Sequence, residues 1–213
     1  QRQMCIRDSF YPALPPRIAS DGSAGGRCRY SGVQWLFPCC LCLMTILLST
    51  LNARYTHASL GLRYLQANMG DLQDMTQLQE FVIGARITDM AERLLQHKPR
   101  IIGFGVYIWN VEETTKLVAL LKRVAPDVVI VLGGPEVSYE SSEQAIVQQA
   151  DYLITGWGDV TFPQLCKQIL YGPKPLMKIH AGVQPPLAEL TLPYGLYTDC
   201  LLYTSDAADD SLR

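Results

Sequence analysis

Four loops that follow predicted β-strands carry the residue types that could hold a ligand. They are NARYTHASLG at 52–61, GVYIWN at 105–110, GGPEVS at 133–138 and GWGDVTF at 156–162. Glycine lets the backbone approach a ligand closely or adopt a positive φ angle. Gly133 and Gly134 follow an apolar run and leave no side chain where a large flat ligand could lie. A tight turn would use the same pair, but the neighbouring Pro135, Glu136 and Ser138 favour a ligand.

His57, in the first of these loops, is the candidate for metal chemistry. Its imidazole could ligate a metal ion or cap the helix that follows. The same loop contains no GxGxxG fingerprint and the chain has no Walker motif, so the sequence argues against nicotinamide, flavin adenine and NTP sites. Gly103 and Gly105 form a lone GxG inside a predicted strand, which is weak support for a nucleotide. Neither the spacing of the carboxylates nor that of Ser, His and Asp residues indicates a complete catalytic site.

The elements that must position these loops alternate regularly along the chain. Apolar strands are predicted at 45–51, 78–84, 100–108 and 127–134, and a fifth strand followed by a turn at 151–158. Amphipathic helices are predicted at 58–68, 87–98, 111–125, 141–150 and 161–172. Asn110 is predicted to cap the third helix, with Glu113 completing a capping box. Strands this apolar, joined by helices, predict a doubly wound parallel sheet covered on both faces, with a flavodoxin-like or Rossmann-like architecture. Ligands of such folds bind at the carboxyl ends of the strands, where these loops lie.

The composition excludes several classes of partner. The 213 residues include 18 Lys and Arg against 20 Asp and Glu, a formal net charge of -2, so we expect no nucleic acid. The apolar run at 35–51 is short for a membrane span, so we expect no membrane contact. Seven cysteines without a disulfide pattern favour a reducing cytoplasm. The cluster CCLC at 39–42 has no spaced second pair, which argues against a metal site.

Both ends of the chain are predicted to be foreign to the domain. QMCIRDS at 3–9 and CLLYTS at 200–205 can be encoded by opposite strands of one short DNA sequence, as expected for a sequencing adapter around a gene fragment. Residues 10–43 have no structural period and precede Met44, which we predict to be the start codon. We therefore expect residues 1–43 to be adapter and upstream read-through, 44–199 to be the domain, and 200–213 to be an adapter-derived tail.

The loops resemble those of the N-terminal cobalamin-binding domain of B12-binding radical SAM enzymes. The resemblance covers about residues 44–199 and is carried by LLSTLNARYTHASLGLRYL, IIGFGVYIWN, VVIVLGGPEVS and ADYLITGWGDVTFPQL. It is strongest in IVLGGPEVS and in the spacing of Gly156, Gly158, Asp159, Thr161 and Phe162. The resemblance implies a flavodoxin-like sheet that binds cobalamin.

The general cobalamin signature is matched in two of its three parts. Gly105-Val106-Tyr107 takes the place of Ser-x-Leu, and Gly133-Gly134 follows at suitable spacing. In the Asp-x-His-x-x-Gly part, the acidic residue is missing before His57 and the glycine comes one place later. The resemblance implies a cobalt ligand in His57. It implies cofactor-binding roles for Asn52, Tyr55, His57, Gly105, Tyr107, Ile108, Trp109, Asn110, Gly133, Gly134, Pro135, Glu136, Gly156 and Gly158.

The resemblance also implies a partner domain. In the family a radical SAM barrel follows, where Cys-x-x-x-Cys-x-x-Cys holds a [4Fe–4S] cluster and S-adenosylmethionine binds. That motif is missing from this chain, so we expect the fragment to bind a corrinoid without catalysing methyl transfer or a radical rearrangement itself. Two alternatives stay open: a stand-alone corrinoid carrier or sensor, and a flavodoxin-like domain without a cofactor.

Overall fold

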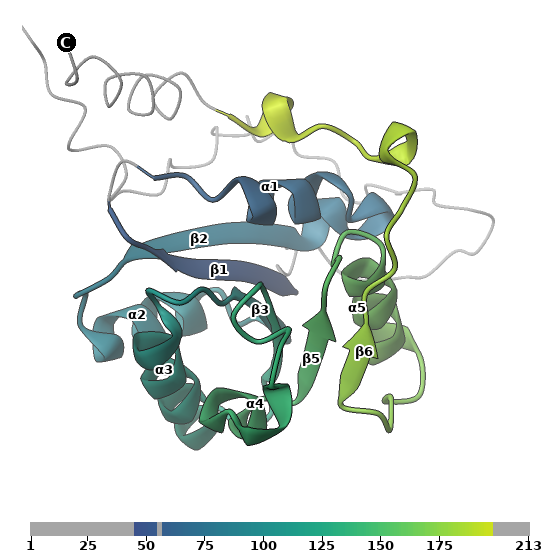
Figure 1. Cartoon of the computed structure of the whole chain (residues 1–213). Coiled ribbons are helices and arrows are strands. Elements are labelled where there is room, and N and C mark those ends of the chain that lie inside the picture. The colour runs from purple at the N-terminus through teal and green to yellow at the C-terminus, as the bar shows by residue number, and fades with distance from the viewer. Residues whose placement is uncertain (1–44, 55–56, 198–213) are drawn as a thin grey trace, which may run out of the picture. The chain divides into compact units, whose positions relative to one another are not determined.

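The computed structural model describes residues 45–54 and 57–197, which form an alternating series of strands and helices (Figure 1). The predictions for the two ends of the chain and for Met44, Tyr55 and the cysteine cluster at 39–42 lie outside the described residues. No helix within 45–54 or 57–197 combines the length and apolarity that crossing a bilayer requires.

A parallel sheet of six strands forms the centre, in the order β2-β1-β3-β4-β5-β6. The strands are β1 Ile46–Asn52, β2 Thr76–Val82, β3 Ile101–Gly105, β4 Val129–Gly133, β5 Tyr152–Thr155 and β6 Ile179–Ala181. All five pairings are parallel. The strand order reverses between β1 and β3, because β2 lies on one side of β1 and the rest of the sheet on the other. This arrangement confirms the predicted flavodoxin-like sheet and opens a crevice at the carboxyl ends of β1 and β3.

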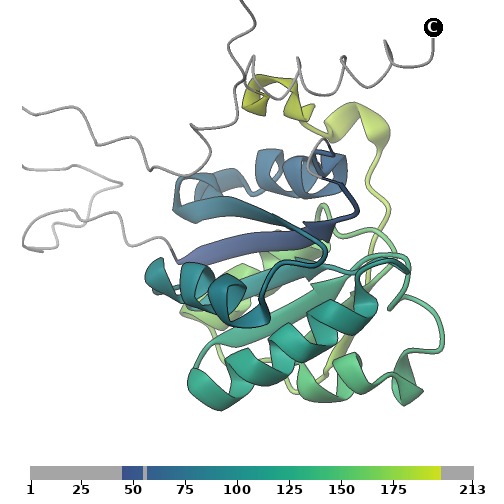
Figure 2. The same ribbon diagram turned by 90° about the vertical axis from the view of Figure 1, so that its left-hand side faces the viewer.

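Helices cover both faces of the sheet, as Figures 1 and 2 show. The α-helices are α1 Leu60–Ala67, α2 Ile87–Gln96, α3 Val111–Val124, α4 Ala145–Gln149 and α5 Thr161–Tyr171. The shorter 3₁₀ helices are η2 Gly70–Met75, η3 Ser141–Glu143, η4 Leu187–Glu189 and η5 Pro193–Leu196. Successive side chains of a strand point to opposite faces, so each strand contributes to two cores. One core packs β-strand side chains such as Phe104 and Leu132 against α2, α3 and α4, and the other packs Leu48 and Val131 against α1 and α5.

The central strands are apolar over their whole length because neither face meets water. All five residues of β3 are buried, as are the first six of the seven residues of β1. The interior of an α/β sheet requires such continuous apolar runs. This is why the sequence pattern located the strands well in the middle of the sheet.

Two strand predictions need correction. The third strand ends at Gly105 and not at Ile108, because Val106–Asn110 turns over the edge of the sheet. A sixth strand, β6, was not predicted at all. It comprises three residues, two of them with exposed side chains, and it is held by backbone hydrogen bonding to β5. Such a strand has neither an apolar run nor an alternating pattern to reveal it.

Candidate functional site

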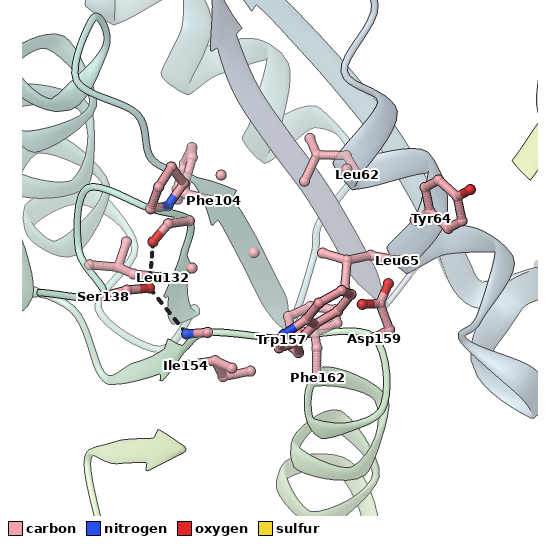
Figure 3. A pocket seen from close by; sticks show the side chains of 18 of the residues that line it. Leu62, Tyr64, Leu65, Phe104, Leu132, Ser138, Ile154, Trp157, Asp159 and Phe162 are labelled. Carbon is pink, nitrogen blue, oxygen red and sulfur yellow. Dashed lines mark hydrogen bonds between the residues drawn. The ribbon is translucent and has the colours of Figure 1, made fainter. Parts of the chain in front are cut away.

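A cavity of about 680 Å³ lies between the carboxyl half of the sheet and the helices α1 and α5 (Figure 3). Its floor comes from β3, β4 and β5, and its walls come from α1, α5 and the strand-end loops. The residues that line it are Leu48, Gly61, Leu62, Tyr64, Leu65, Gly103, Phe104, Gly105, Tyr107, Val131, Leu132, Gly133, Gly134, Pro135, Ser138, Tyr139, Ile154, Gly156, Trp157, Gly158, Asp159, Phe162, Leu187 and Leu190. Most of this lining is apolar, which suits a ligand that carries an aromatic or hydrocarbon part.

The floor of the cavity is open because two paired glycines form it. Gly105 of β3 and Gly133 of β4 are register partners in neighbouring strands. A Cβ atom added to Gly133 would meet only the Ile154 carbonyl oxygen, 3.9 Å away, and one added to Gly105 would meet nothing closer than 3.5 Å. Neither glycine is needed for its own backbone angle, because neither has a positive φ. Their missing side chains therefore provide space above the sheet.

Gly134 serves a different purpose from Gly133. It has a φ of 115° and its Cβ position would overlap the Val106 carbonyl oxygen, so only glycine fits there. The Val106 N–H donates to the Gly133 carbonyl at 2.8 Å, which brings the loops after β3 and β4 together. Ser138 adds a second tie: its hydroxyl donates to the Gly134 carbonyl at 2.7 Å and accepts from the Gly156 N–H at 3.1 Å (Figure 3). Three strand-end loops are thus held in one arrangement around the cavity.

The rim beside β3 carries a stacked aromatic pair. The rings of Tyr107 and Trp109 lie 4.6 Å apart between centroids and within 6° of parallel. The Trp109 indole N–H donates to the Leu51 carbonyl at 3.3 Å, yet the side chain remains 49% exposed. The neighbouring Ile108 is 76% exposed. Large apolar side chains held rigidly at the edge of a cavity are typical of a ligand platform.

Asn110 is the fully buried residue that positions this aromatic pair. Its side-chain carbonyl accepts from the Tyr107 N–H at 2.8 Å, and its amide donates to the Leu51 carbonyl at 3.0 Å, with Thr50 and Gly105 also in reach. The predicted capping box is wrong, because the Asn110 side chain makes no cap hydrogen bond to α3. Glu113 instead accepts from the Gly84 N–H. Asn110 fastens the ends of β1 and β3 at the point where the strand order reverses.

We expect Asn110→Ala to lower the free energy of unfolding by about 2–3 kcal/mol, because buried backbone groups lose their partners. Urea denaturation measures the loss. Asn68→Ala is the matched control, since Asn68 is only half-buried and also uses its amide to fix a loop. Its cost should not exceed about 1 kcal/mol. Equal losses for the two variants would contradict the positioning role of Asn110.

The loop between β1 and α1 is organised by the carboxylate of Glu80 on β2. Glu80 pairs with Arg63 at 2.7 Å and accepts from the Asn52 side-chain amide at 2.9 Å and from the Ser59 N–H at 2.6 Å. Asn52 also donates to the His57 carbonyl at 2.8 Å. These bonds fix the start of α1, whose cap is Ser59 and not His57. His57 is exposed and is not part of the cavity lining.

The described residues contain no group of three or more His, Cys, Asp and Glu side chains placed to hold a metal ion. If His57 binds cobalt, it does so as a single protein ligand. A single imidazole could serve as such a ligand, but a metal-bound imidazole is normally oriented by a hydrogen-bond acceptor at its other ring nitrogen. Asn52 bonds the backbone of His57 rather than its ring.

The predicted site residues fall into two groups. Those that line the cavity are Gly105, Tyr107, Gly133, Gly134, Pro135, Gly156 and Gly158. Those that lie outside its lining are Asn52, His57, Ile108, Trp109, Asn110 and Glu136, while Tyr55 lies outside the described residues. The second group surrounds the strand ends and positions or borders the cavity, as the contacts of Asn52, Trp109 and Asn110 show.

Several lining residues were missed by the sequence analysis. α1 contributes Leu62, Tyr64 and Leu65 (Figure 3). The predicted loop 156–162 contributes Trp157, Asp159 and Phe162, which were not among the predicted cofactor-binding residues. The helical spacing of the α1 residues marks them as inward-facing, but it does not distinguish a packed core from a cavity wall. The segment 182–197 adds Leu187 and Leu190. It runs beside α5 and over α1 in Figure 1. Asn68, at the end of α1, exchanges hydrogen bonds of 2.9 and 3.1 Å with the backbone of Thr191 in this segment.

Comparison with known proteins agrees with this geometry. A family model described as B12 binding domain matches residues 46–166, from β1 into α5. The chain belongs to the B12-binding domain family. The match supports cobalamin as the cofactor. No curated protein matches the chain.

Solved structures resemble this B12-binding domain at low identity. One is a cobalamin-binding protein from Desulfitobacterium hafniense DCB-2, with 17% identity and a TM-score of 0.44 over 58% of this chain and 57% of that one. Another is the cobalamin-dependent S-adenosylmethionine radical enzyme OxsB, with 18% identity and a TM-score of 0.47 over 61% of this chain and 19% of that one. A third is the CheY-like protein tadZ from Pseudomonas aeruginosa PAO1, with 17% identity and a TM-score of 0.45 over 62% and 98%. The chain thus spans about half of the first structure and a fifth of the second.

Proposed function

We propose that this B12-binding domain holds a corrinoid whose nucleotide loop enters the cavity and whose corrin ring rests on the strand-end loops. The observation that carries the proposal is the open floor at Gly133, where a side chain would project into the cavity without meeting a wall. The apolar lining and the volume of about 680 Å³ suit an aromatic lower base. A bound corrinoid would supply cobalt-centred methyl transfer or radical chemistry.

The residues around the cavity take distinct roles in this proposal. Gly105 and Gly133 leave room for the lower base against the sheet, and Gly134 lets the loops after β3 and β4 meet. Tyr107, Ile108 and Trp109 border the ring with exposed apolar surface. Pro135, Glu136, Gly156 and Gly158 contact the ligand from the loops after β4 and β5. Asn52 and Asn110 act through the backbone that they hold.

We infer that the parent protein is a B12-dependent radical SAM enzyme. In it a barrel after this domain would hold the [4Fe–4S] cluster and S-adenosylmethionine in the cytoplasm. Support comes from the resemblance of residues 131–138 and 156–162 to that family. The alternative is a stand-alone corrinoid carrier or sensor. The sequence of the complete gene discriminates between the two, since a Cys-x-x-x-Cys-x-x-Cys motif after this domain favours the enzyme and its absence favours the carrier.

Titration of the chain with hydroxocobalamin, followed in the visible spectrum, tests corrinoid binding. We expect saturable binding with a change in the corrin bands. No binding up to about 100 μM, where the binding free energy would be only about 5–6 kcal/mol, would favour a flavodoxin-like domain without a cofactor.

His57→Ala tests axial ligation in the same titration. We propose His57 as the cobalt ligand, because it is the histidine in the loop after β1. Loss of an imidazole ligand would shift the spectrum of the bound corrinoid toward that of an aquo form. His97→Ala, at the end of α2, is the control. An unchanged spectrum for His57→Ala would show that cobalt takes no ligand from this loop.

A further inference from the structure

Asp159 introduces a charge into an otherwise neutral cavity. It lies in the turn between β5 and α5, and it lines the cavity together with Leu65 of α1 and Trp157 (Figure 3). Among the described residues that line the cavity, it is the one that is charged at neutral pH. A carboxylate next to apolar walls loses hydration, and this costs free energy unless a donor replaces the water.

The carboxylate of Asp159 has unused capacity to accept hydrogen bonds. Within the described residues its partner is its own backbone N–H, and no Lys, Arg or His pairs with it. It does not cap α5, whose first turn receives no side-chain cap hydrogen bond. Burial raises the pKa of the Asp159 carboxyl above its ordinary value, and the bond from its own N–H offsets part of this. Neither a salt bridge nor a helix cap therefore accounts for an acid at this position.

An ionised carboxylate accepts hydrogen bonds and does not donate them. A phosphate placed beside it would be repelled, whereas a hydroxyl or an N–H group would be bound. A corrinoid offers donors in two places: the amide side chains of the ring, and the ribose hydroxyls or purine amine of the nucleotide loop. Asp159 lines the cavity that we assign to the nucleotide loop, so the nucleotide loop is the part that would reach it.

We propose that Asp159 is a specificity-determining residue that accepts a hydrogen bond from a donor of the nucleotide loop, so that the domain prefers complete corrinoids to those lacking this loop. This inference rests on the proposed corrinoid function. A lower base with an exocyclic amine, such as adenine, would add a second donor. We therefore expect adeninylcobamide to bind at least as tightly as cobalamin, whose benzimidazole base has no exocyclic amine.

The test compares wild type with Asp159→Ala and Asp159→Asn, using hydroxocobalamin, adeninylcobamide and cobinamide as probes. Asp127→Asn is the control, since Asp127 is exposed and lies before β4, at the opposite end of the sheet. A hydrogen bond to a charged acceptor corresponds to about a tenfold change in Kd or more. We expect Asp159→Ala to weaken both nucleotide-bearing corrinoids about tenfold, Asp159→Asn to weaken them less, and cobinamide binding to change less than twofold.

The melting temperature of the ligand-free chain gives a second readout. Because burial disfavours the charged form of Asp159, the Asp159→Asn variant should be at least as stable as wild type at neutral pH. A melting temperature at or above that of wild type, combined with weaker binding of the nucleotide-bearing corrinoids, is a result that a purely structural role of Asp159 would not produce. Unchanged cobalamin affinity in Asp159→Ala, or an equal loss for cobinamide, would overturn the proposal. If wild type bound none of the probes, the corrinoid function itself would fail.

Discussion

Replacing Gly133 by valine is expected to weaken hydroxocobalamin binding by about 30-fold or more while leaving the domain folded. The valine Cβ would project into the cavity beside the Ile154 carbonyl, and its two methyl groups would occupy the space above β4. Forcing extra methyl groups into a filled site typically costs about 1–3 kcal/mol, and about 2 kcal/mol corresponds to this change in Kd. The fold should tolerate valine because Gly133 has an ordinary negative or extended φ and valine suits a strand.

A graded series makes the Gly133 experiment specific. Gly133→Ala adds one methyl group and should weaken binding less than Gly133→Val does. Gly195→Val is the matched control, because a Cβ there meets nothing within 4 Å and Gly195 lies outside the cavity lining. Visible-band titration gives Kd and thermal melting confirms folding. Wild-type affinity in Gly133→Val would show that the corrinoid does not use the floor of this cavity.

The sequence could predict the floor of the site because glycine encodes it directly. A missing side chain at Gly105 and Gly133 is visible in the sequence, and so is the positive-φ turn that Gly134 allows. The apolar runs of β1, β3 and β4 then fix which edge of the sheet these glycines reach. Features that depend on a single glycine, such as an open floor or a positive-φ turn, can therefore be predicted from the sequence.

The walls of the site could not be predicted in the same way. Leu62 and Leu65 have the helical spacing of ordinary core residues, and this spacing does not reveal that they line a cavity. Leu187 and Leu190 belong to a segment without strand or helix periodicity. That segment is held by local contacts such as the Asn68–Thr191 pair. Such contacts join residues more than a hundred positions apart, and no local pattern records them.

Polar residues were predicted by type but not by role. Asn110 was expected to cap α3, and its position as the residue before the helix is correct. However, its side chain instead bonds the Leu51 carbonyl at the end of β1 and the Tyr107 N–H just after β3, because buried backbone groups at the strand ends need hydrogen-bond partners. Glu80 was not predicted to matter, since nothing in the pattern of β2 places its carboxylate under α1.

Replacing Glu80 by alanine is expected to lower the free energy of unfolding by about 3–5 kcal/mol. Arg63 is only 4% exposed, and Glu80, at 17%, is the carboxylate that neutralises it. Removing one partner of a buried pair leaves the other charge without compensation, and losses of this size are typical. The Asn52 amide and the Ser59 N–H would lose their acceptor as well. Urea denaturation at neutral pH measures the loss.

Two further variants separate charge from packing. Glu112→Ala removes an ion pair with Lys116 in which both side chains are exposed. The free energy of unfolding of this variant should not differ measurably from that of wild type. Glu80→Ala combined with Arg63→Met removes both buried charges and should recover a large part of the lost stability, since an apolar pair needs no compensation. A double variant as unstable as Glu80→Ala would contradict this account and would assign the loss to the hydrogen bonds from the Asn52 side-chain amide and the Ser59 N–H.

The same pair links stability to the site. Arg63 and Ser59 belong to the start of α1, and α1 supplies Leu62 and Leu65 to the cavity wall. Arg63 also lies 5.2 Å from the ring of Tyr197, at the end of the segment that crosses the cavity. If Glu80 holds α1 in place, Glu80→Gln should weaken hydroxocobalamin binding even under conditions in which the domain remains folded. Because Glu80 itself does not line the cavity, this loss would arise through the position of α1 or of the loop between β1 and α1 that Glu80 also holds.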